Sequence, residues 1–151
     1  MFRGNITATV DEKGRLKIPT AFKDTLDEKY GPDLDFFVTS LEGGSVRIYP
    51  LPVWIKIEES LVPVRGEKDA NKIKRLFLER TNYWGQTARG DAQGRVLIPP
   101  LLRERAGMQG EVAVMGRVEY LEVSSMERKR EPMAQPITDE DRAGLDDLGI
   151  D

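Results

Sequence analysis

The sequence contains no histidine and no cysteine among its 151 residues. The chain therefore lacks the most common general base, the most common thiol nucleophile and the usual zinc ligands. Without cysteine it also forms no disulfide, so the cytoplasm is the expected compartment. We expect no enzyme, no metal, no cofactor and no small-molecule substrate. Carboxylates, lysine or serine can also catalyse reactions, so an enzyme that uses one of these groups is a further hypothesis beside the two that are given below.

Long hydrophobic runs are missing as well. No apolar stretch approaches the roughly 20 residues that a transmembrane helix requires, so we expect no membrane partner. Hydrophobic residues make up 39% of the chain and charged residues 32%. This composition and length predict a globular protein with one domain, or with two small half-domains that share a core.

The net charge of −3 is unevenly distributed. From Glu131 to the C-terminus there are seven acidic residues and one basic residue, which gives −6. The preceding 130 residues contain 22 basic and 19 acidic residues, which gives +3. An acidic tail thus conceals a mildly basic body. A charge of +3 is too small to identify a nucleic-acid-binding protein. What matters is therefore where the charges lie.

One pattern occurs twice, 80 residues apart. Residues 7–19 and 87–99 both read T-A-x-x-D-x-x-G-R-[LV]-x-I-P. An internal repeat of this kind determines the whole architecture, so the other features are interpreted in its light. We therefore predict two copies of one small β-rich unit.

The centre of each copy has the chemistry of a tight turn. Asp11 and Asp91 can accept hydrogen bonds from backbone N–H groups just ahead, and Gly14 and Gly94 can adopt a positive φ. These four residues are predicted to shape the turns. On the simplest interpretation the arginine that follows each glycine only pairs across the hairpin.

The first copy carries a row of cations that folding does not need. Strand alternation places Lys13, Arg15 and Lys17 on one face and turns Leu16 and Ile18 toward the core. Cations that repel one another on one edge suit contacts to phosphates or base edges. We predict that this row binds DNA.

The second copy keeps fewer cations. Gln93 replaces Lys13 and Leu97 replaces Lys17, so Arg95 alone remains. Two further arginines, Arg3 and Arg89, are expected in the strands that precede the two turns and are predicted to join the same surface. We expect the first copy to dominate DNA affinity.

Periodicity and breakers predict the remaining elements. Each copy should run as a hairpin, a short helix, a second hairpin and a further helix, with an amphipathic helix from about Asp69 to Tyr83 between the copies. The predicted strands include Glu111–Met115 and Val118–Val123, and Ser124 to Glu127 matches a capping box. The predicted organisation is a first repeat at 1–63, a loop and linker helix at 64–83, a second repeat at 84–130, and an acidic tail at 131–151 that is disordered or ends in a frayed helix.

The repeated motif followed by a short helix resembles the AbrB/SpoVT class of swapped-hairpin DNA-binding domains. Two copies in one chain, with Met1-Phe2-Arg3-Gly4 at the start and Tyr49-Pro50-x-x-x-Trp54, resemble the MraZ family of bacterial transcriptional regulators. The resemblance covers roughly residues 1–130 and excludes the tail.

The resemblance implies a β-rich α+β fold in which pseudo-twofold-related units form one compact, barrel-like domain. It also implies a ring of several chains that binds direct repeats in double-stranded DNA upstream of its own division and cell-wall gene cluster, and that is associated with the nucleoid. Arg15 and Arg95 would contact DNA. The alternative is an oligomeric structural or interaction protein whose repeats serve assembly only.

Overall fold

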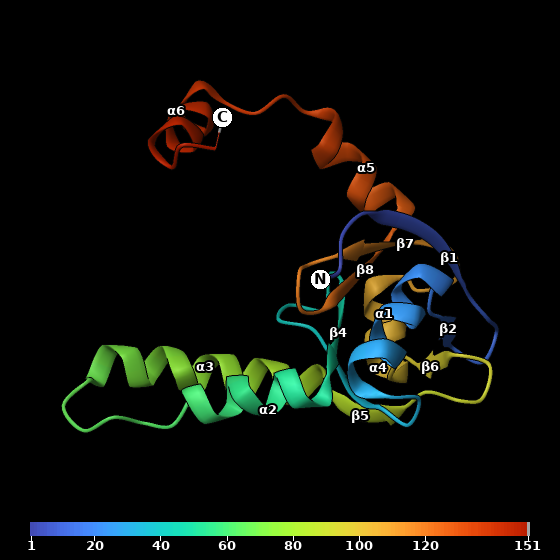
Figure 1. Cartoon of the computed structure of the whole chain (residues 1–151). Helices are drawn as coiled ribbons and strands as arrows, with labels where there is room; N and C mark the ends of the chain where they lie inside the picture. The colour runs from blue at the N-terminus through green and yellow to red at the C-terminus, as the bar shows by residue number, and fades with distance from the viewer. Residues whose placement is uncertain (151) are drawn as a thin grey trace.

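The computed structural model describes residues 1–150, which form a β-rich α+β domain with two projections (Figure 1). The eight strands are β1 Asn5–Val10, β2 Arg15–Lys17, β3 Asp35–Thr39, β4 Val46–Pro50, β5 Gln86–Arg89, β6 Arg95–Leu97, β7 Gly110–Gly116 and β8 Leu121–Ser125. The six helices are α1 Thr20–Tyr30, α2 Leu51–Ser60, α3 Lys68–Trp84, α4 Pro100–Ala106, α5 Met126–Ala134 and α6 Asp139–Asp147.

All eight strands belong to one antiparallel sheet in the order β5-β3-β4-β8-β7-β1-β2-β6. The two edge strands, β5 and β6, are joined by the second repeated turn, in which the Asp91 N–H donates to the Arg95 carbonyl at 2.9 Å. The edges therefore lie close together, and the sheet curls into a nearly closed barrel. This confirms the predicted fold class.

The two halves exchange strands. β1 pairs with β7 of the second half at six positions, but with β2 only at Val10 and Leu16. In the same way β5 pairs with β3 of the first half. The expected local hairpins are thus opened, and each strand before a turn pairs mainly with the other copy. This interlocking explains why the two repeats form one domain.

A pseudo-twofold axis passes through the β2–β6 pair, where Leu16 lies opposite Val96. On one side the Ile18 N–H donates to the Gly94 carbonyl at 3.0 Å, and on the other the Ile98 N–H donates to the Gly14 carbonyl at 2.9 Å. Leu16, Val96 and Ile98 are fully buried, and Ile18 is nearly so. The apolar residues of the repeated motif are therefore the centre of the shared core, as the alternation predicts.

Helices α2 and α3 form an arm that projects from the barrel (Figure 1). Aromatic residues anchor its base: Trp54 of α2 stacks on Phe37 with ring centroids 4.6 Å apart and also contacts Tyr49 and Phe77. Trp54 is only 2% exposed, so it belongs to the core of the chain.

Three local details differ from the sequence prediction. The strand predicted at Val118 begins at Leu121, because Val118 has a φ of 67° within the preceding turn. Helix α3 begins at Lys68, one residue before the predicted start at Asp69, which lies in its first turn after Glu67 at the N-cap. Ser125 caps α5 by accepting from the Arg128 N–H, so the capping motif is one residue later than the sequence suggested.

The acidic segment from residue 131 contains the end of α5 and all of α6. α6 has a capping box, in which Thr138 accepts from the Asp141 N–H and Asp141 accepts from the Thr138 N–H. Its position corresponds to the final helix that the sequence predicts as frayed. Figure 1 shows α6 well away from the barrel, at the end of a short extended link from α5.

Candidate nucleic-acid interface

The first repeated turn is held by one carboxylate. Asp11 Oδ1 accepts from the backbone N–H groups of Lys13 and Arg15, each at 3.0 Å, and Oδ2 accepts from Arg15 Nε at 2.9 Å. Gly14 completes the turn with a φ of 82°, which explains why glycine occupies this position. A single aspartate thus shapes the turn and also aims the arginine.

The second turn reproduces this arrangement. Asp91 Oδ1 accepts from the N–H groups of Gln93 and Arg95, each at 2.9 Å, Oδ2 accepts from Arg95 Nε at 2.8 Å, and Gly94 has a φ of 76°. In both copies the pKa of the aspartate lies below its ordinary value. The largest cause is the hydrogen bond from the backbone N–H of the arginine. Partial burial raises the pKa, and the nearby guanidinium lowers it further. The turn-shaping role of these residues agrees with the geometry.

The tertiary structure brings the two motifs together on one strand pair. In the β2–β6 register Arg15 lies opposite Leu97, and Lys17 lies opposite Arg95. Because the intervening Leu16 and Val96 point into the core, these four side chains lie on the outward face. Arg15, Lys17, Arg95 and Leu97 are called the shared strand face below.

The electrostatics of the shared strand face favour an anion. Like charges directly opposite each other across an antiparallel pair are destabilising, and Lys17 and Arg95 form such a pair. Each arginine uses Nε to bind its own aspartate. Within residues 1–150 the terminal Nη atoms of Arg15 donate no hydrogen bond, whereas Arg95 Nη1 lies 3.8 Å from Asp11 Oδ2. The Arg15 donors are therefore available to a ligand.

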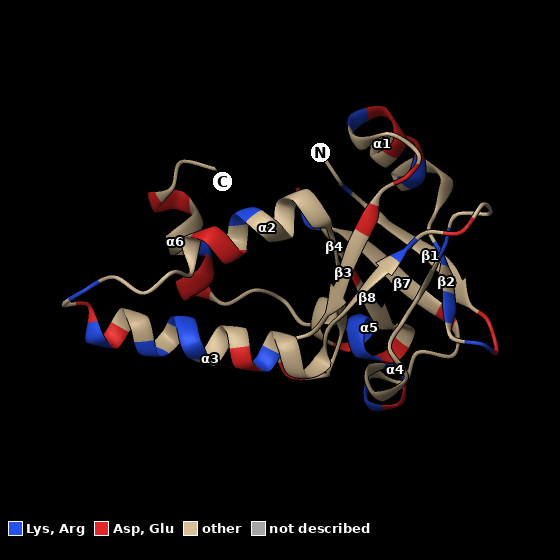
Figure 2. Cartoon of the chain, turned by 90° about the horizontal axis from the view of Figure 1, so that it is seen from below, with Lys and Arg blue, Asp and Glu red and all other residues tan. Residues whose placement is uncertain are grey.

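The other predicted contact residues lie around this face or away from it. Lys13 belongs to the turn, because β2 begins only at Arg15. Figure 2 shows the basic residues of β2 in blue beside the charged turn that precedes it. Arg3 lies eight residues before Asp11, at the opposite end of β1, which corresponds to roughly 25 Å along an extended chain.

Arg89 is engaged elsewhere. Its Nε donates to Asp35 Oδ1 at 2.8 Å and its Nη2 donates to Asp35 Oδ2 at 3.3 Å, on the neighbouring strand β3. This ion pair lowers the pKa of Asp35 and raises that of Arg89, in each case first through the side-chain hydrogen bond. Most of the charge of Arg89 is thus balanced within the fold.

A residue that sequence reasoning missed lies over the first turn. A Cβ at Gly14 would fall 1.5 Å from Arg103 Nη1, so the α4 arginine of the second copy packs directly on the glycine of the first. Within residues 1–150 this buried Nη1 has no hydrogen-bond partner. Lys23, which is 80 residues earlier in the chain, packs in the same way on Gly94. The 80-residue offset relates Lys23 to Arg103 in the sequence, but only the strand exchange brings each of them into contact with the glycine of the other copy.

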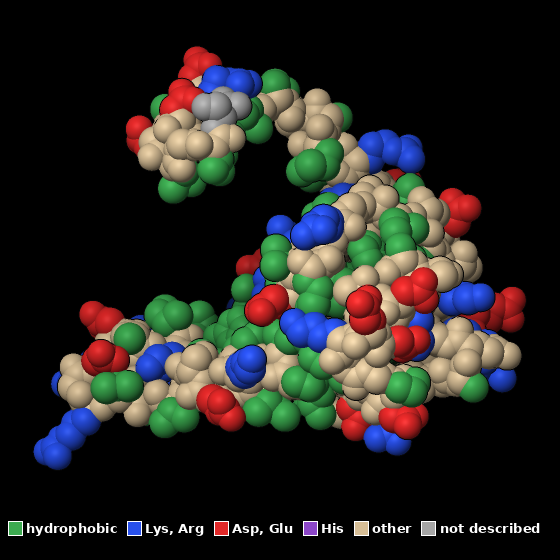
Figure 3. All heavy atoms as spheres, viewed as in Figure 1, with side chains coloured by type: hydrophobic (Ala, Val, Ile, Leu, Met, Phe, Trp, Pro, Cys, Tyr) green, Lys and Arg blue, Asp and Glu red, His purple; other side chains and the backbone are tan. Residues whose placement is uncertain are grey.

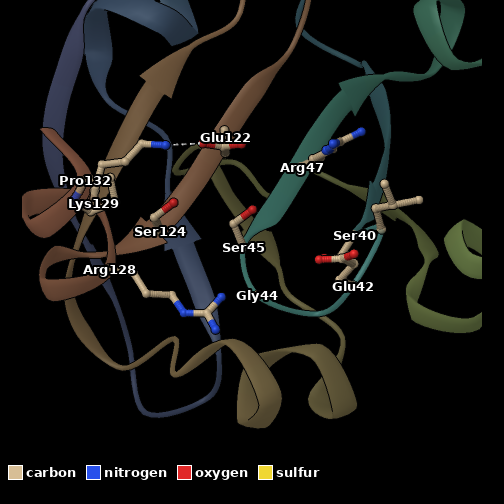
Figure 4. Close-up of a pocket in the computed structure, with 11 residues that line it drawn as sticks. Ser40, Glu42, Gly44, Ser45, Arg47, Glu122, Ser124, Arg128, Lys129 and Pro132 are labelled. Carbon is tan, nitrogen blue, oxygen red and sulfur yellow. Dashed lines mark hydrogen bonds and ion pairs between the residues drawn. The ribbon is translucent and has the colours of Figure 1, made fainter. Parts of the chain in front are cut away.

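A separate pocket of about 290 Å³ is lined by residues of β4, β8, α5 and the loop before β4 (Figure 4). It has charges of both signs. Lys129 Nζ lies 2.6 Å from Glu122 Oε1, and Arg117 Nη2 lies 3.2 Å from Glu122 Oε2. Burial raises the pKa of Glu122, but these two hydrogen bonds outweigh burial and leave the pKa below its ordinary value. The pocket carboxylate is therefore neutralised by its neighbours.

Two features are absent from residues 1–150. No group of three or more acidic side chains there is arranged to hold a metal ion. Among the helices of the same residues, none has the length and hydrophobicity needed to span a membrane.

The fold defines the class of the protein: a barrel made of two interlocked swapped-hairpin units, whose repeated turns converge on one basic strand pair. A family model described as "MraZ protein, putative antitoxin-like" matches residues 86–131. The chain is 46% identical to the transcriptional regulator MraZ of Acidobacterium capsulatum, over 99% of this chain and all of the relative. It is 44% identical to that of Koribacter versatilis over the same shares, and 35% identical to that of Leuconostoc citreum, over 98% of this chain and 94% of the relative. The chain belongs to the MraZ family of transcriptional regulators.

Proposed function

We propose that this protein regulates transcription by binding double-stranded DNA through the shared strand face. The observation that carries the proposal is the cross-strand pair of Lys17 and Arg95, flanked by Arg15. Three cations from two distant parts of the chain converge on one outward surface. A phosphate placed over them relieves their mutual repulsion and accepts from the arginine donors.

The motif aspartates fit this function. Each binds the Nε of its own arginine, and this restricts the plane of the guanidinium group. A guanidinium held in this way loses less rotational freedom when it binds a phosphate or a guanine edge. The aspartates are therefore positioning residues, and the arginines are the contact residues.

One chain offers few contacts, so we further propose that several chains act together. A ring of identical subunits presents the same face repeatedly and raises avidity without new contacts. Direct repeats spaced by about one helical turn of DNA would be read by successive subunits. The proposed target is the region upstream of the chain's own division and cell-wall gene cluster, which places the protein in the cytoplasm at the nucleoid.

The test is a gel shift on that upstream DNA, combined with the mass of the complex from light scattering. Wild-type protein should shift the specific fragment at lower concentration than an unrelated fragment, and Arg15→Ala should lose the shift while keeping the same mass. Glu12→Ala serves as the matched control, since it removes an exposed charge from the same turn. If Arg15→Ala binds as wild type does, the shared strand face is not the DNA contact. A protein that assembles but never shifts DNA would instead be the assembly-only alternative.

A further inference from the structure

The α2–α3 arm carries an uncovered apolar stripe. On α3, Ile73, Leu76 and Tyr83 are spaced so that they lie on one side of the helix. Their exposed fractions are 61%, 48% and 64%. The side of α3 that packs on the protein lies beside this stripe, roughly a quarter to a third of a turn around the helix from its centre, and includes Phe77 and the buried Thr81. The stripe is therefore a second apolar surface in addition to the one that holds the arm in place.

The C-terminal helix α6 carries a matching apolar end. Leu148 is 73% exposed and Ile150 is 68% exposed. The helix closes with a turn in which the Ile150 N–H donates to the Leu145 carbonyl at 3.2 Å, which gathers these apolar residues at one end. Figure 3 shows hydrophobic side chains in green both on this helix and along the arm.

The two helices have opposite charge. α3 carries five basic and two acidic residues, and α6 carries five acidic residues and one basic residue. Lys72 lies at the edge of the apolar stripe of α3, and Arg80 lies within it, four residues after Leu76 and three before Tyr83. Asp146 and Asp147 lie beside the apolar end of α6. Apolar faces bordered by complementary charges are typical of a specific interface.

We propose that α6 of one chain docks on the α3 stripe of a second copy of this chain. The interface is formed by Ile73, Leu76 and Tyr83 on the arm and by Leu145, Leu148 and Ile150 on the tail. This inference rests on the homo-oligomer of the proposed function, and it names the surfaces that would join its subunits.

A second copy fits better than the chain's own tail. The link between α5 and α6 is only the four residues Gln135 to Thr138, and its proline keeps the preceding residue extended. Figure 1 accordingly shows α6 projecting from the body. Six large apolar side chains of the arm and its connecting loop are more than one-third exposed: Ile55, Val62, Val64, Ile73, Leu76 and Tyr83.

The geometry of such a contact determines the kind of assembly. The donor surface on α6 and the acceptor surface on α3 are different parts of the chain, so the contact is heterologous. A heterologous contact repeated from chain to chain gives a closed ring if the rotation closes, and a filament otherwise.

Disulfide trapping tests this directly, because the chain has no cysteine of its own. One batch of protein carries Ile73→Cys and another carries Leu148→Cys, and the two are mixed without DNA under mild oxidation. A docked pair has an effective concentration near millimolar, so at about 10 μM protein the cross-link should form on the order of 100 times faster than by random collision. Arg75→Cys mixed with Leu148→Cys is the matched control, since Arg75 is exposed on another side of the same helix.

The expected result is a reducible dimer band for the Ile73 mixture at a rate far above that of the Arg75 mixture. Equal rates would overturn the proposal. So would a chain carrying both Ile73→Cys and Leu148→Cys that cross-links only within itself, since the occupant would then be its own tail.

A second measurement does not depend on cysteine chemistry. A chain that ends at Ala134 should have a lower mass in light scattering, because it lacks the donor helix. If that chain keeps the wild-type mass and binds DNA more tightly, the acidic tail covers the basic face instead, and the docking proposal fails. Because the cross-link is measured without DNA, a failed gel shift with an intact cross-link faults only the proposed DNA function.

Discussion

Replacing Lys17 with leucine is expected to stabilise the fold and weaken DNA binding at the same time. The change makes the first copy resemble the second, which already has Leu97 at the equivalent position. Lys17 is exposed and lies directly opposite Arg95 in the β2–β6 register. The substitution therefore removes a repulsive cross-strand pair without disturbing a core contact.

The two effects have separate magnitudes. A cross-strand pair contributes about 0.2–1 kcal/mol, so removal of this repulsion should raise the free energy of unfolding by a few tenths of a kcal/mol. Loss of one phosphate contact should lower the slope of log affinity against log salt by about 0.9 for each subunit bound. When the salt concentration rises fourfold, the variant should therefore lose roughly threefold less affinity than the wild type for each phosphate contact removed.

Urea unfolding measures the first effect, and fluorescence anisotropy on upstream DNA between 50 and 200 mM salt measures the second. The reciprocal variant Leu97→Lys is the matched control, because it adds a cation beside Arg15 on the same face. It should reduce stability slightly and steepen the salt slope. If Lys17→Leu destabilises the protein and leaves the slope unchanged, Lys17 has a structural role and the reasoning is wrong.

Three further predictions concern the repeated turns. Arg15→Ala should cost more DNA affinity than Arg95→Ala in gel shifts, because Arg95 already lies near two carboxylates; equal losses would refute this asymmetry. Gly14→Ala should lower the urea midpoint more than Gly94→Ala, because both strain a positive φ but only the first displaces a buried guanidinium. Asp11→Asn should reduce the loss of stability in acid, measured by circular dichroism. The lowered pKa of Asp11 stabilises the fold at pH values above the unfolded-state pKa of about 3.9. This contribution disappears as the pH falls through the folded-state pKa. An unchanged acid transition would show that the carboxylate does not contribute.

The sequence by itself determined the local units. The 80-residue offset revealed the duplication, the aspartate and glycine of each copy specified the turns, and alternation placed Leu16 and Ile18 in the core. These features depend on backbone geometry and side-chain period, which act over a few residues and can be read from any short stretch. The family was recognisable from the same motif.

Only the tertiary structure decided how the copies combine. Each copy alone suggested a local hairpin, with a basic row only in the first copy. The strands exchange partners instead, so Arg95 lies opposite Lys17 and both repeats form one face. The same exchange places Arg103 on Gly14, and an ion pair with Asp35 engages Arg89. Strand partners at large sequence separation depend on burial of the whole core, and a period of two residues does not specify them. The repeat is therefore visible in the sequence, whereas the shared strand face is formed only by the fold.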